Sequence, residues 1–399
     1  MAKNKTPLTF LCISSYFKGE EFIRSCKAEG NNVFLVTSKK LEDKAWPLES
    51  IDDIFYMQQD EKDNWVMKDL IVGLSFFMRN HKVDRIVALD DFDVEKAAHI
   101  REHFRIPGMG ETTARFFRDK LAMRIKALDA GINVPPFSPL FNDVEINEYA
   151  DTIAPPWVVK PRSEASADGI QKVHNKEELW KAIHGLGEER HQYLVEQFKP
   201  GDVYHVDAIS AEGKLVFCRA SQYLNTPMEV AHGGGIFRST TVEFDSKDDK
   251  ALQRMNAKVM KAFGMQYSAS HTEFIKSKED GKFYFLETAS RVGGAHLCEM
   301  VEASSGINLW REWAKLESAV AKGKTYKVPR VKKEHAGIVV SLSRYQNPDD
   351  SSFTDNEIWW RLEMEHHIGM IVKAKKREKV VDLLDDYAKR IAKDFHAKA

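Results

Sequence analysis

Residues 271–291 read HTEFIKSKEDGKFYFLETASR. Two aromatic and apolar runs flank Glu279-Asp280-Gly281, and an Asp-Gly pair between such runs is typical of a β-hairpin turn. The hairpin makes the runs antiparallel neighbours and places one carboxylate, Glu273 or Glu287, in each. A carboxylate inside an apolar strand is costly unless positive charge compensates for it. Mg²⁺ bound to nucleotide phosphates would do so, because it prefers carboxylate and phosphate oxygens; the alternative is a pair of surface glutamates.

The size and charge of the chain limit its class. It has 399 residues, with Lys+Arg 59 against Asp+Glu 60 and a formal net charge of −1. At roughly 150 residues per domain this length predicts two or three domains. The balanced charge gives no global attraction to nucleic acid or to an anionic membrane, so neither is expected as a partner. No apolar run approaches the roughly 18 residues of a membrane span.

Cysteine usage indicates neither a disulfide framework nor a structural zinc site. The chain has four cysteines, none in a C-x-x-C pair: Cys12, Cys26, Cys218 and Cys298. The first apolar stretch, residues 8–13, is too short for a signal sequence. A cytoplasmic, reducing setting fits these observations best.

The first 110 residues alternate between strand and helix patterns. Strands are expected at residues 8–14, 32–38 and 84–90, and helices at 17–30 and 65–80. Repeated β-α-β units predict a doubly wound parallel sheet. GMGETT at Gly108 lacks the third glycine of a dinucleotide fingerprint and reads as a turn into a helix.

The rest of the chain changes from helical to antiparallel patterns. Residues 112–131 are predicted to form one helix with Phe117, Leu121, Ile125 and Leu128 on its apolar face. Antiparallel strands are expected from residue 193 onward, with Glu212-Gly213 as a hairpin turn. A helix is expected at 246–263, further strands at 337–342 and 368–374, and a final amphipathic helix around 380–391.

Two lysines and a loop of small residues could hold phosphate groups. Lys120 follows Asp119 in the predicted helix, and Lys160 ends the apolar run Pro-Trp-Val-Val, where an unpaired ammonium would be expensive. The loop Ser163–Gly169 has no bulky side chain, so its N–H groups could close over phosphates. The alternatives are snorkelling lysines and a flexible turn. No G-x-x-x-x-G-K-[ST] sequence is present, which rules out a P-loop.

The order of these features resembles the ATP-grasp superfamily. It is a helix with Asp-Lys, a strand with Lys and a small-residue loop, a strand with Val-Glu-Gln-Phe, then Glu273 and the E-x-x-x-R of residues 287–291. The resemblance runs from about Lys120 to Arg291. It implies an α/β and α+β fold class, in which a doubly wound parallel-sheet domain precedes an ATP-grasp fold of two α+β subdomains.

The resemblance also implies domain boundaries. Residues 1–111 would form the Rossmann-like domain in front of the ATP-grasp fold. Residues 112–195 would form the first subdomain with a mobile phosphate loop, and 196–328 the second subdomain with the metal site. Residues 329–399 would be a small C-terminal α+β segment packed on the ATP-grasp domain.

Carried over residue by residue, the resemblance implies a role for each motif. The metal ligands would be Glu273 and Glu287, with one or two Mg²⁺ ions that Mn²⁺ can replace. Arg291 would neutralise the transferring phosphoryl group or the acyl-phosphate; the alternative is a pair with a surface acid such as Glu299 or Glu302. The ATP-binding residues would be Lys120, Lys160, Ser163, Ser166, Gly169, Glu196, Gln197 and Phe198, with Glu196 accepting from the adenine amino group.

Two positions depart from the pattern of the superfamily. Many members have a ribose-binding Glu seven residues after the hinge Glu, where this chain has Val203, so ribose contact must come from elsewhere, for example Asp202. Many members read E-x-N-x-R, whereas this chain has ETASR, and Ala289 cannot bind a metal ion. E-x-A-x-R beside an HTEF-type strand, followed by RVGG, resembles the branch with the L-amino-acid ligases.

Three further regions are candidates for substrate binding. The stretch MEVAHGGGIFRS holds His232, Gly234 and Arg238, which could form a loop over a substrate carboxylate, or be only a connector. His271 shares a strand face with Glu273 and could orient substrate or act as a base; a buried hydrogen-bonded His is the alternative. His205 is a weaker candidate, and Gly294 follows Arg291 in RVGG.

The resemblance implies an ATP-dependent ligase that joins a small-molecule carboxylate to an amine through an acyl-phosphate, on amino-acid-like substrates. One alternative is another ATP-grasp outcome, such as a biotin-carboxylase-like reaction or a thiol acceptor. The other is a nucleotide-binding regulatory protein without catalysis. The acid, the amine and the oligomeric state are not given by the sequence, and a homodimer is compatible with it.

Overall fold

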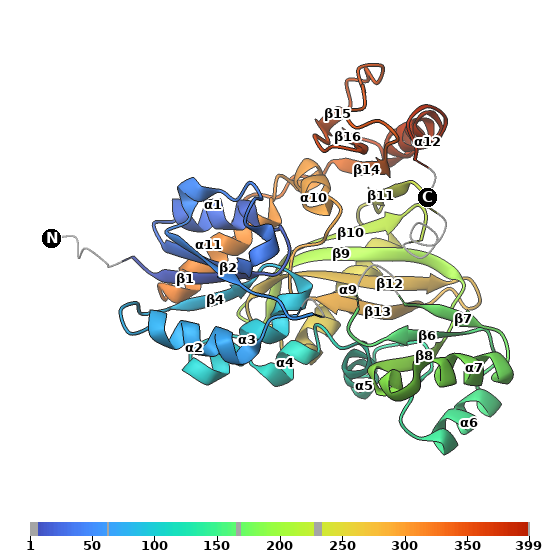
Figure 1. The fold of residues 1–399 in the computed structure, drawn as a ribbon. Helices are drawn as coiled ribbons and strands as arrows, with labels where there is room; N and C mark the ends of the chain where they lie inside the picture. The colour runs from blue at the N-terminus through green and yellow to red at the C-terminus, as the bar shows by residue number, and fades with distance from the viewer. Residues whose placement is uncertain (1–6, 62–63, 165–168, 227–233, 398–399) are drawn as a thin grey trace.

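The computed structural model describes residues 7–61, 64–164, 169–226 and 234–397. Three β-sheets organise these residues: a parallel sheet at the N-terminus, a small antiparallel sheet, and an eight-stranded sheet that holds most of the second half (Figure 1). The expected mixture of a parallel-sheet domain and antiparallel α+β parts is confirmed. In the described part of the chain, none of the helices has the length and apolar character needed to cross a membrane.

The N-terminal sheet is the predicted doubly wound one. Its parallel strands have the order β3-β2-β1-β4. They are β1 (Thr9–Ser14), β2 (Asn32–Ser38), β3 (Asp53–Met57) and β4 (Arg85–Ala88). One face packs on α1 (Glu20–Ala28) and α11 (Leu309–Ala321), and the other on α2 (Met67–Phe77) and α3 (Val94–Phe104). Short 3₁₀ turns lie at Lys39–Leu41, Leu48–Ser50 and, directly after β4, Asp91–Asp93.

The single helix predicted at residues 112–131 is wrong. The chain forms α4 (Glu111–Arg115) and α5 (Lys120–Asp129), because Asp119 adopts an extended conformation and caps α5 by accepting from the N–H groups of Leu121 and Ala122. Lys120 is therefore the first residue of α5, not a mid-helix residue. The predicted apolar face is only half right, since Ile125 and Leu128 are exposed.

The small sheet has the order β5-β8-β6-β7. Its strands are β5 (Phe137–Pro139), β6 (Trp157–Pro161), β7 (Gln171–Val173) and β8 (Tyr193–Gln197), covered by α6 (Asp143–Thr152) and α7 (Lys176–Leu186), with a 3₁₀ turn at Gly187–Gln192. Trp157 lies at the centre of its core. Lys160 and Glu196 come from neighbouring strands of this sheet, and this positions them for the site.

The large sheet has the order β13-β12-β9-β10-β11-β14-β16-β15. Its strands are β9 (Gly201–Ala211), β10 (Lys214–Tyr223), β11 (Phe237–Thr241), β12 (Ser268–Ser277), β13 (Phe283–Ala289), β14 (His335–Leu342), β15 (Ile358–Arg361) and β16 (His367–Ala374). Among the helices that pack on it are α9 (Lys247–Phe263), α10 (Leu297–Ser305) and α12 (Arg377–Asp394). The hairpins predicted at residues 212–213 and 279–281 both occur here.

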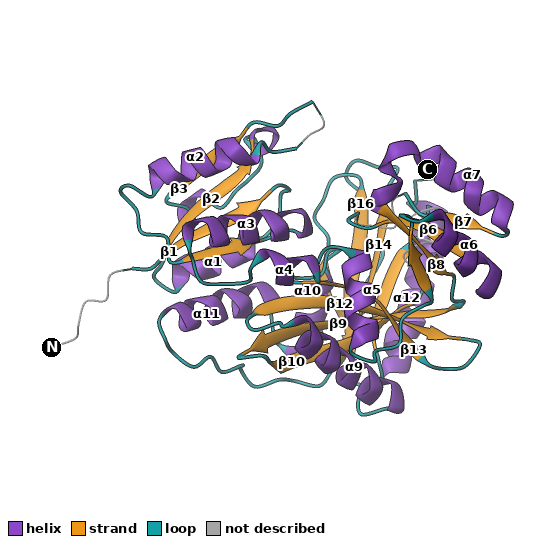
Figure 2. Ribbon diagram, turned by 90° about the horizontal axis from the view of Figure 1, so that it is seen from below, coloured by secondary structure: helices purple, strands orange, loops and turns teal. Residues whose placement is uncertain are grey.

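The structure moves two of the predicted boundaries. The boundary between residues 195 and 196 falls inside β8, so the division lies in the connection from β8 to β9. The boundary at 328–329 separates strands of one continuous sheet, because β14, β16 and β15 extend the sheet of β9–β13. Helix α11, assigned to the second subdomain, packs both against α1 of the N-terminal domain and against β9 and β12 of the large sheet (Figure 2).

Candidate active site

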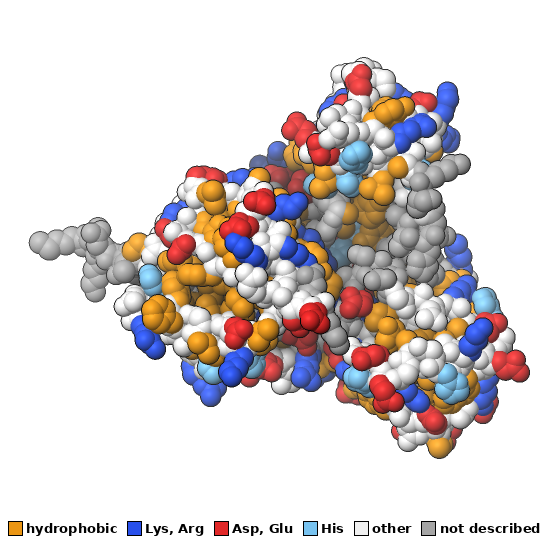
Figure 3. Space-filling model, in the orientation of Figure 1, with side chains coloured by type: hydrophobic (Ala, Val, Ile, Leu, Met, Phe, Trp, Pro, Cys, Tyr) orange, Lys and Arg blue, Asp and Glu red, His pale blue; other side chains and the backbone are white. Residues whose placement is uncertain are grey.

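A pocket of about 230 Å³ lies where the parts of the chain meet. Figure 3 shows the molecule hollowed between the N-terminal lobe on the left, the C-terminal strands at the top and the small sheet at the lower right. The pocket receives side chains from the turn after β4, from the α4–α5 connection and from β10, β12 and β13. Its charged lining residues are Asp91, Arg118, Lys120, Glu164, His271, Glu273, Glu287 and Arg291.

Glu273 and Glu287 stand directly opposite each other on β12 and β13, as the hairpin predicts. The Tyr223 hydroxyl donates to Glu273 Oε1 at 2.8 Å, and Lys120 Nζ lies 3.0 Å from Glu287 Oε2. Burial opposes ionisation of Glu287, but the charges of Lys120 and Lys160 outweigh it and lower its pKa to about 2. Glu287 is therefore suited to act as an anionic oxygen ligand near neutral pH.

This pair fits a magnesium ion by the chemistry of its donors. Each carboxylate uses one oxygen in the contacts given above, and among the described residues the other oxygen of each has no protein partner. Two carboxylate oxygens from facing strands, completed by phosphate and water, match the hard oxygen ligands that Mg²⁺ takes. That Glu273 and Glu287 bind the ion stays a prediction.

Lys160 and Glu196 form a buried ion pair with a third residue that the sequence analysis missed. Lys160 Nζ donates to Glu196 Oε1, and Arg124 Nε donates to Glu196 Oε2 at 2.9 Å. Burial is the main cause that lowers the pKa of Lys160 to about 8. Burial also opposes ionisation of Glu196, but Arg124 and Lys160 outweigh it and lower the pKa of that carboxyl. The cluster thus keeps one net positive charge beneath the small sheet.

Two backbone N–H groups of the proposed adenine-binding stretch already form hydrogen bonds within the protein. The N–H groups of Gln197 and Phe198 donate to the carbonyls of Pro136 and Pro156 at 2.8 and 3.0 Å. Because these N–H groups are already used, the carbonyl groups of Gln197 and Phe198 are the backbone groups that could bind the adenine ring. The predicted adenine contacts of Glu196, Gln197 and Phe198 stay predictions.

The phosphate loop is described in part. Ser166 lies outside the described residues, as do 165, 167 and 168. Lys120 Nζ donates to the carbonyl of Glu164 at 2.5 Å and also pairs with Glu287, which brings the start of the loop next to β13. Gly169 has a φ of 68°, a conformation that favours glycine. Ser163 makes no contact that tests its predicted role.

A protein-family model for the ATP-grasp domain matches residues 153–299 of this chain. The chain carries an ATP-grasp domain. The matched segment contains the strand of Lys160, the Val-Glu-Gln-Phe stretch and both metal-binding candidates, so the resemblance seen in the sequence is confirmed.

Two curated proteins that are similar to this chain are both ligases. The chain is 26% identical over 267 residues to an L-arginine-specific L-amino acid ligase of Bacillus subtilis, a match that covers 65% of this chain and 62% of the relative. It is 22% identical over 182 residues to a D-alanine–D-alanine ligase of Neisseria meningitidis, covering 45% and 59%. The chain therefore spans about three fifths of the length of these relatives.

Solved structures share the complete fold. The L-amino acid ligase of Bacillus licheniformis superposes with a TM-score of 0.74 at 17% identity, covering 98% of this chain and 99% of that one. The biotin carboxylase domain of a Hydrogenobacter thermophilus 2-oxoglutarate carboxylase, solved with MgADP and bicarbonate, gives 0.71 at 17% identity, covering 96% and 90%. At 17% identity these comparisons show that the fold is shared and nothing more.

Arg291, which follows β13, pairs with Asp91 of the N-terminal domain. Its Nη1 also donates to the carbonyl of Val292 at 2.9 Å. The next residue but one, Gly293, passes so close to Asp207 and His271 that a Cβ there would lie 2.9 Å from Asp207 Oδ1 and 2.9 Å from His271 Nδ1. Gly294 lines the pocket.

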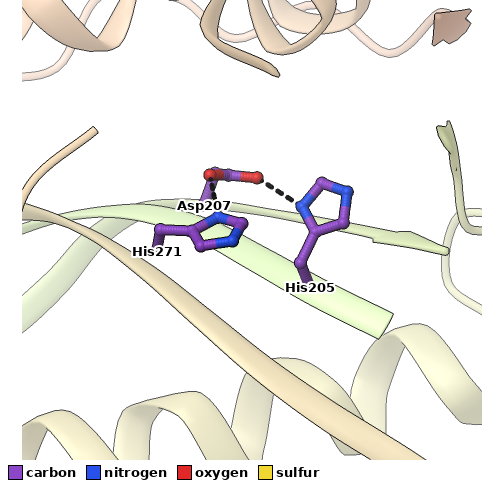
Figure 4. Close-up of side chains that lie close together, drawn as sticks. All are labelled: His205, Asp207 and His271. Carbon is purple, nitrogen blue, oxygen red and sulfur yellow. Dashed lines mark hydrogen bonds and ion pairs between the residues drawn. The ribbon is translucent and has the colours of Figure 1, made fainter. Parts of the chain in front are cut away.

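Asp207 lies between two imidazoles in the centre of the large sheet (Figure 4). His205 Nδ1 is 2.7 Å from Asp207 Oδ2, and His271 Nδ1 is 2.8 Å from Oδ1. Burial opposes both ionisations, but the imidazoles hold the pKa of Asp207 well below its usual range, and Asp207 with Glu273 raises the pKa of His271 to about 10. This raised pKa favours the protonated form of His271, which lines the pocket.

These three side chains are close enough for a single metal ion, since their ligand atoms lie within 4.8 Å of one another. They are instead joined by hydrogen bonds, and His205 Nε2 is also 2.7 Å from Ser239 Oγ. Gly293 packs directly against Asp207 and His271. The arrangement therefore reads as a hydrogen-bonded network under Glu273, whose Oε1 lies 3.5 Å from His271 Nε2.

The described candidates of the MEVAHGGGIFRS stretch, Gly234 and Arg238, do not line this pocket. His232 lies outside the described residues. Arg238 pairs with Asp385 of α12 and donates to Asn225, so its charge is already compensated. The substrate role predicted for Gly234 and Arg238 therefore gains no support from the pocket.

Two departures from the common ATP-grasp pattern are visible in the sheet. Val203 is buried in β9, and Ala289 is buried at the end of β13, so neither offers a polar group to a nucleotide or metal ion. Asp202, next to Val203, is half-exposed and lies 3.8 Å from Lys278. Ribose contact by Asp202 stays a prediction.

Proposed function

We propose that this protein is an ATP-dependent carboxylate–amine ligase that forms an amide bond between amino-acid-like substrates and releases ADP and phosphate. The observation that carries the proposal is the meeting of two facing carboxylates, Lys120 and Arg291 in one pocket. The two curated relatives described above are both ligases that act on amino acids, and this similarity supports the same reaction class.

The proposed reaction has two steps. A carboxylate oxygen of the first substrate bonds to the γ-phosphorus of ATP while the bond from that phosphorus to the β,γ-bridging oxygen breaks, giving an acyl-phosphate and ADP. The amine nitrogen of the second substrate then bonds to the acyl carbon, the carbon–oxygen bond to phosphate breaks, and the amine loses a proton. Alignment and charge neutralisation are what such a reaction requires of a protein.

The lysines supply the neutralisation in this proposal. Lys120 lies 3.0 Å from Glu287 and Lys160 is paired with Glu196, so each ammonium is held at a fixed place before ATP arrives. Polyphosphate oxygens would share these ammonium groups with the carboxylates. Mg²⁺, or Mn²⁺ in its place, would bind between Glu273 and Glu287 and would neutralise charge on the phosphates.

Arg291 acts at the reacting end in this proposal. Its guanidinium lines the pocket beside Glu287 and is held by Asp91, so it cannot turn away from the phosphoryl group. A planar guanidinium can donate to two oxygens of an acyl-phosphate at once, which an ammonium cannot. A fixed donor of this kind costs little reorganisation as charge develops.

The test is ADP release by the purified full chain with ATP and Mg²⁺. Each of the twenty L-amino acids and a set of other carboxylates is supplied with and without an amine, and products are identified by mass spectrometry. The proposal expects ADP formation that requires both acid and amine, with an amide product. Release that depends on bicarbonate without an amine would indicate a carboxylase, and no release with any combination would indicate a protein without catalysis.

A further inference from the structure

Arg118 is a buried guanidinium that the predicted mechanism does not use. It lies in the connection between α4 and α5 and is 8% exposed. Its guanidinium carbon sits 4.3 Å from the centre of the Phe92 ring, and the side chain lines the pocket that holds Glu273, Glu287 and Arg291. Stacking on an aromatic ring fixes the plane of the guanidinium.

Its charge is uncompensated, unlike that of its neighbours. Lys120 is paired with Glu287, Lys160 and Arg124 with Glu196, and Arg291 with Asp91. Across the ranges that the structure describes, no carboxylate forms an ion pair with Arg118. A charge that is nine-tenths buried without a partner is costly, and the cost falls when an anion binds.

The position of Arg118 favours contact with a substrate rather than with the nucleotide. Phe92, which stacks on it, belongs to the same short turn as Asp91, which holds Arg291. One turn of the N-terminal domain thus holds two guanidinium groups at the pocket. Of the two lysines proposed to bind the ATP phosphates, Lys160 lies on the small sheet, and Lys120, which lines the same pocket as Arg118, is already paired with Glu287.

From these observations we propose that Arg118 binds the carboxylate of a substrate through its planar guanidinium. The inference rests on the proposed ligase function, and it assigns to Arg118 the anion-binding role that the sequence analysis gave to Arg238. A stacked guanidinium with free donors matches the two coplanar oxygens of a carboxylate. Arg118 is then a specificity residue, which selects acids over uncharged analogues.

The test uses R118M, R118K and, as a matched control, R115M, which changes an exposed arginine one turn earlier. KM values for the acid, the amine and ATP are measured separately, and thermal midpoints check the fold. R118M should raise KM for one carboxylate-bearing substrate at least tenfold, about 1.4 kcal/mol, with KM for ATP within threefold. The KM of R118K for that substrate should lie between those of R118M and the parent, because lysine keeps the positive charge but cannot donate to both carboxylate oxygens as a guanidinium does.

A rise in KM for ATP alone would overturn the inference, because Arg118 would then bind phosphate. KM values in R118M that equal those in R115M would also overturn it. Binding without turnover separates this inference from the ligase proposal: thermal shifts of parent and variants are measured with a non-hydrolysable ATP analogue plus L-arginine, L-alanine, their amides or inorganic phosphate. The acids, but not the amides, should stabilise the parent, and this stabilisation should be lost in R118M, whether or not ligation is observed.

Stabilisation by the acids that is equal in R118M and the parent would overturn the carboxylate role, as would stabilisation by inorganic phosphate that is lost in R118M.

Discussion

Arg291 donates through Nη2 to Oδ2 of Asp91, a residue 200 positions earlier in the chain. The pair joins the end of β13 to the turn after β4, so the N-terminal domain holds a charged group of the ATP-grasp site in place. The alternative pairing with Glu299 or Glu302 is wrong, because Glu302 is paired with Arg311 and Glu299 lies near His296. Burial opposes the charge on Arg291, but Asp91 outweighs it and raises its pKa.

We predict that Arg291→Lys keeps the fold and ATP binding but loses most ligation. A lysine can still pair with Asp91, but its ammonium cannot donate to two oxygens of a planar group. The measurements are nucleotide affinity and the rate of ADP release by the purified variant. If affinity and rate both stay within about threefold of the parent, near 0.65 kcal/mol, the catalytic role of Arg291 is wrong.

We predict that Glu287→Ala lowers turnover by at least about a hundredfold, the effect typical of losing one electrostatic stabiliser. The substitution removes the predicted metal ligand and leaves Lys120 without its acidic partner. Glu279→Ala is the matched control, since Glu279 lies on the same hairpin and pairs with Lys199 at the surface. Turnover of Glu287→Ala close to that of the control would contradict the assignment.

We predict that Glu196→Ala destabilises the protein by about 3 to 5 kcal/mol, the range found when one partner of a buried ion pair is removed. Lys160 and Arg124 would be left as two buried positive charges without an acid. Urea unfolding of the variant and the parent, monitored by circular dichroism, gives the difference. A loss below about 1 kcal/mol would mean that the two cations find water or another partner.

The sequence could predict the carboxylate pair but not the buried cations. Alternation along a strand and an Asp-Gly turn fix which residues face each other, so Glu273 and Glu287 followed from local rules. Arginine in a helix normally points to solvent, and nothing local marks Arg124 or Arg118 as buried. The one available signal is that Arg124 lies four residues after Lys120 and so shares its helix face.

Long-range contacts also explain the broken helix. No Gly or Pro interrupts residues 112–130, so the sequence favours one helix. The break exists because Asp119 caps α5 while the N–H of Lys120 donates to the carbonyl of Arg162 at 2.8 Å. The His205–Asp207–His271 network is easier to predict from the sequence. Polar residues alternate in both strands, and the pairing of β9 with β12 places His271 opposite Asp207.

We predict that the stability contributed by His271 falls as pH rises from about 6.5 to about 10, and that the decline of the parent is clearest below about pH 8, because the lowered pKa of Lys160 has the opposite effect above it. The folded protein raises the pKa of His271 to about 10, so the stabilisation from its charge is complete below the unfolded pKa, about 6.5. It is lost as pH rises through the folded pKa, with a slope of at most about 1.4 kcal/mol per pH unit. Unfolding free energies are measured by urea at pH 6, 7.5 and 9.

The variant His271→Asn isolates this group, because it keeps a hydrogen-bonding side chain but cannot titrate. It should be less stable than the parent at pH 6 and should lack most of the decline toward pH 9. An equal decline in parent and variant would assign the effect to other groups.

Finally, we predict that Gly293→Ala destabilises the protein by about 1 to 3 kcal/mol, the usual cost of overpacking, whereas Gly294→Ala changes stability by less than about 0.5 kcal/mol. The new methyl at 293 would lie 2.9 Å from both Asp207 Oδ1 and His271 Nδ1, whereas at 294 it would meet no atom within 4 Å. Neither glycine has the positive φ that would strain an alanine. Adjacent positions with the same substitution therefore differ only in what the methyl meets, and urea unfolding of both variants measures that difference.

Because Asp207 and His271 are fixed in the large sheet, the strand end with Arg291 must give way, so Gly293→Ala should also reduce ADP release. Equal stability of the two alanine variants would mean that the network yields to the methyl and does not fix the position of the Arg291 segment.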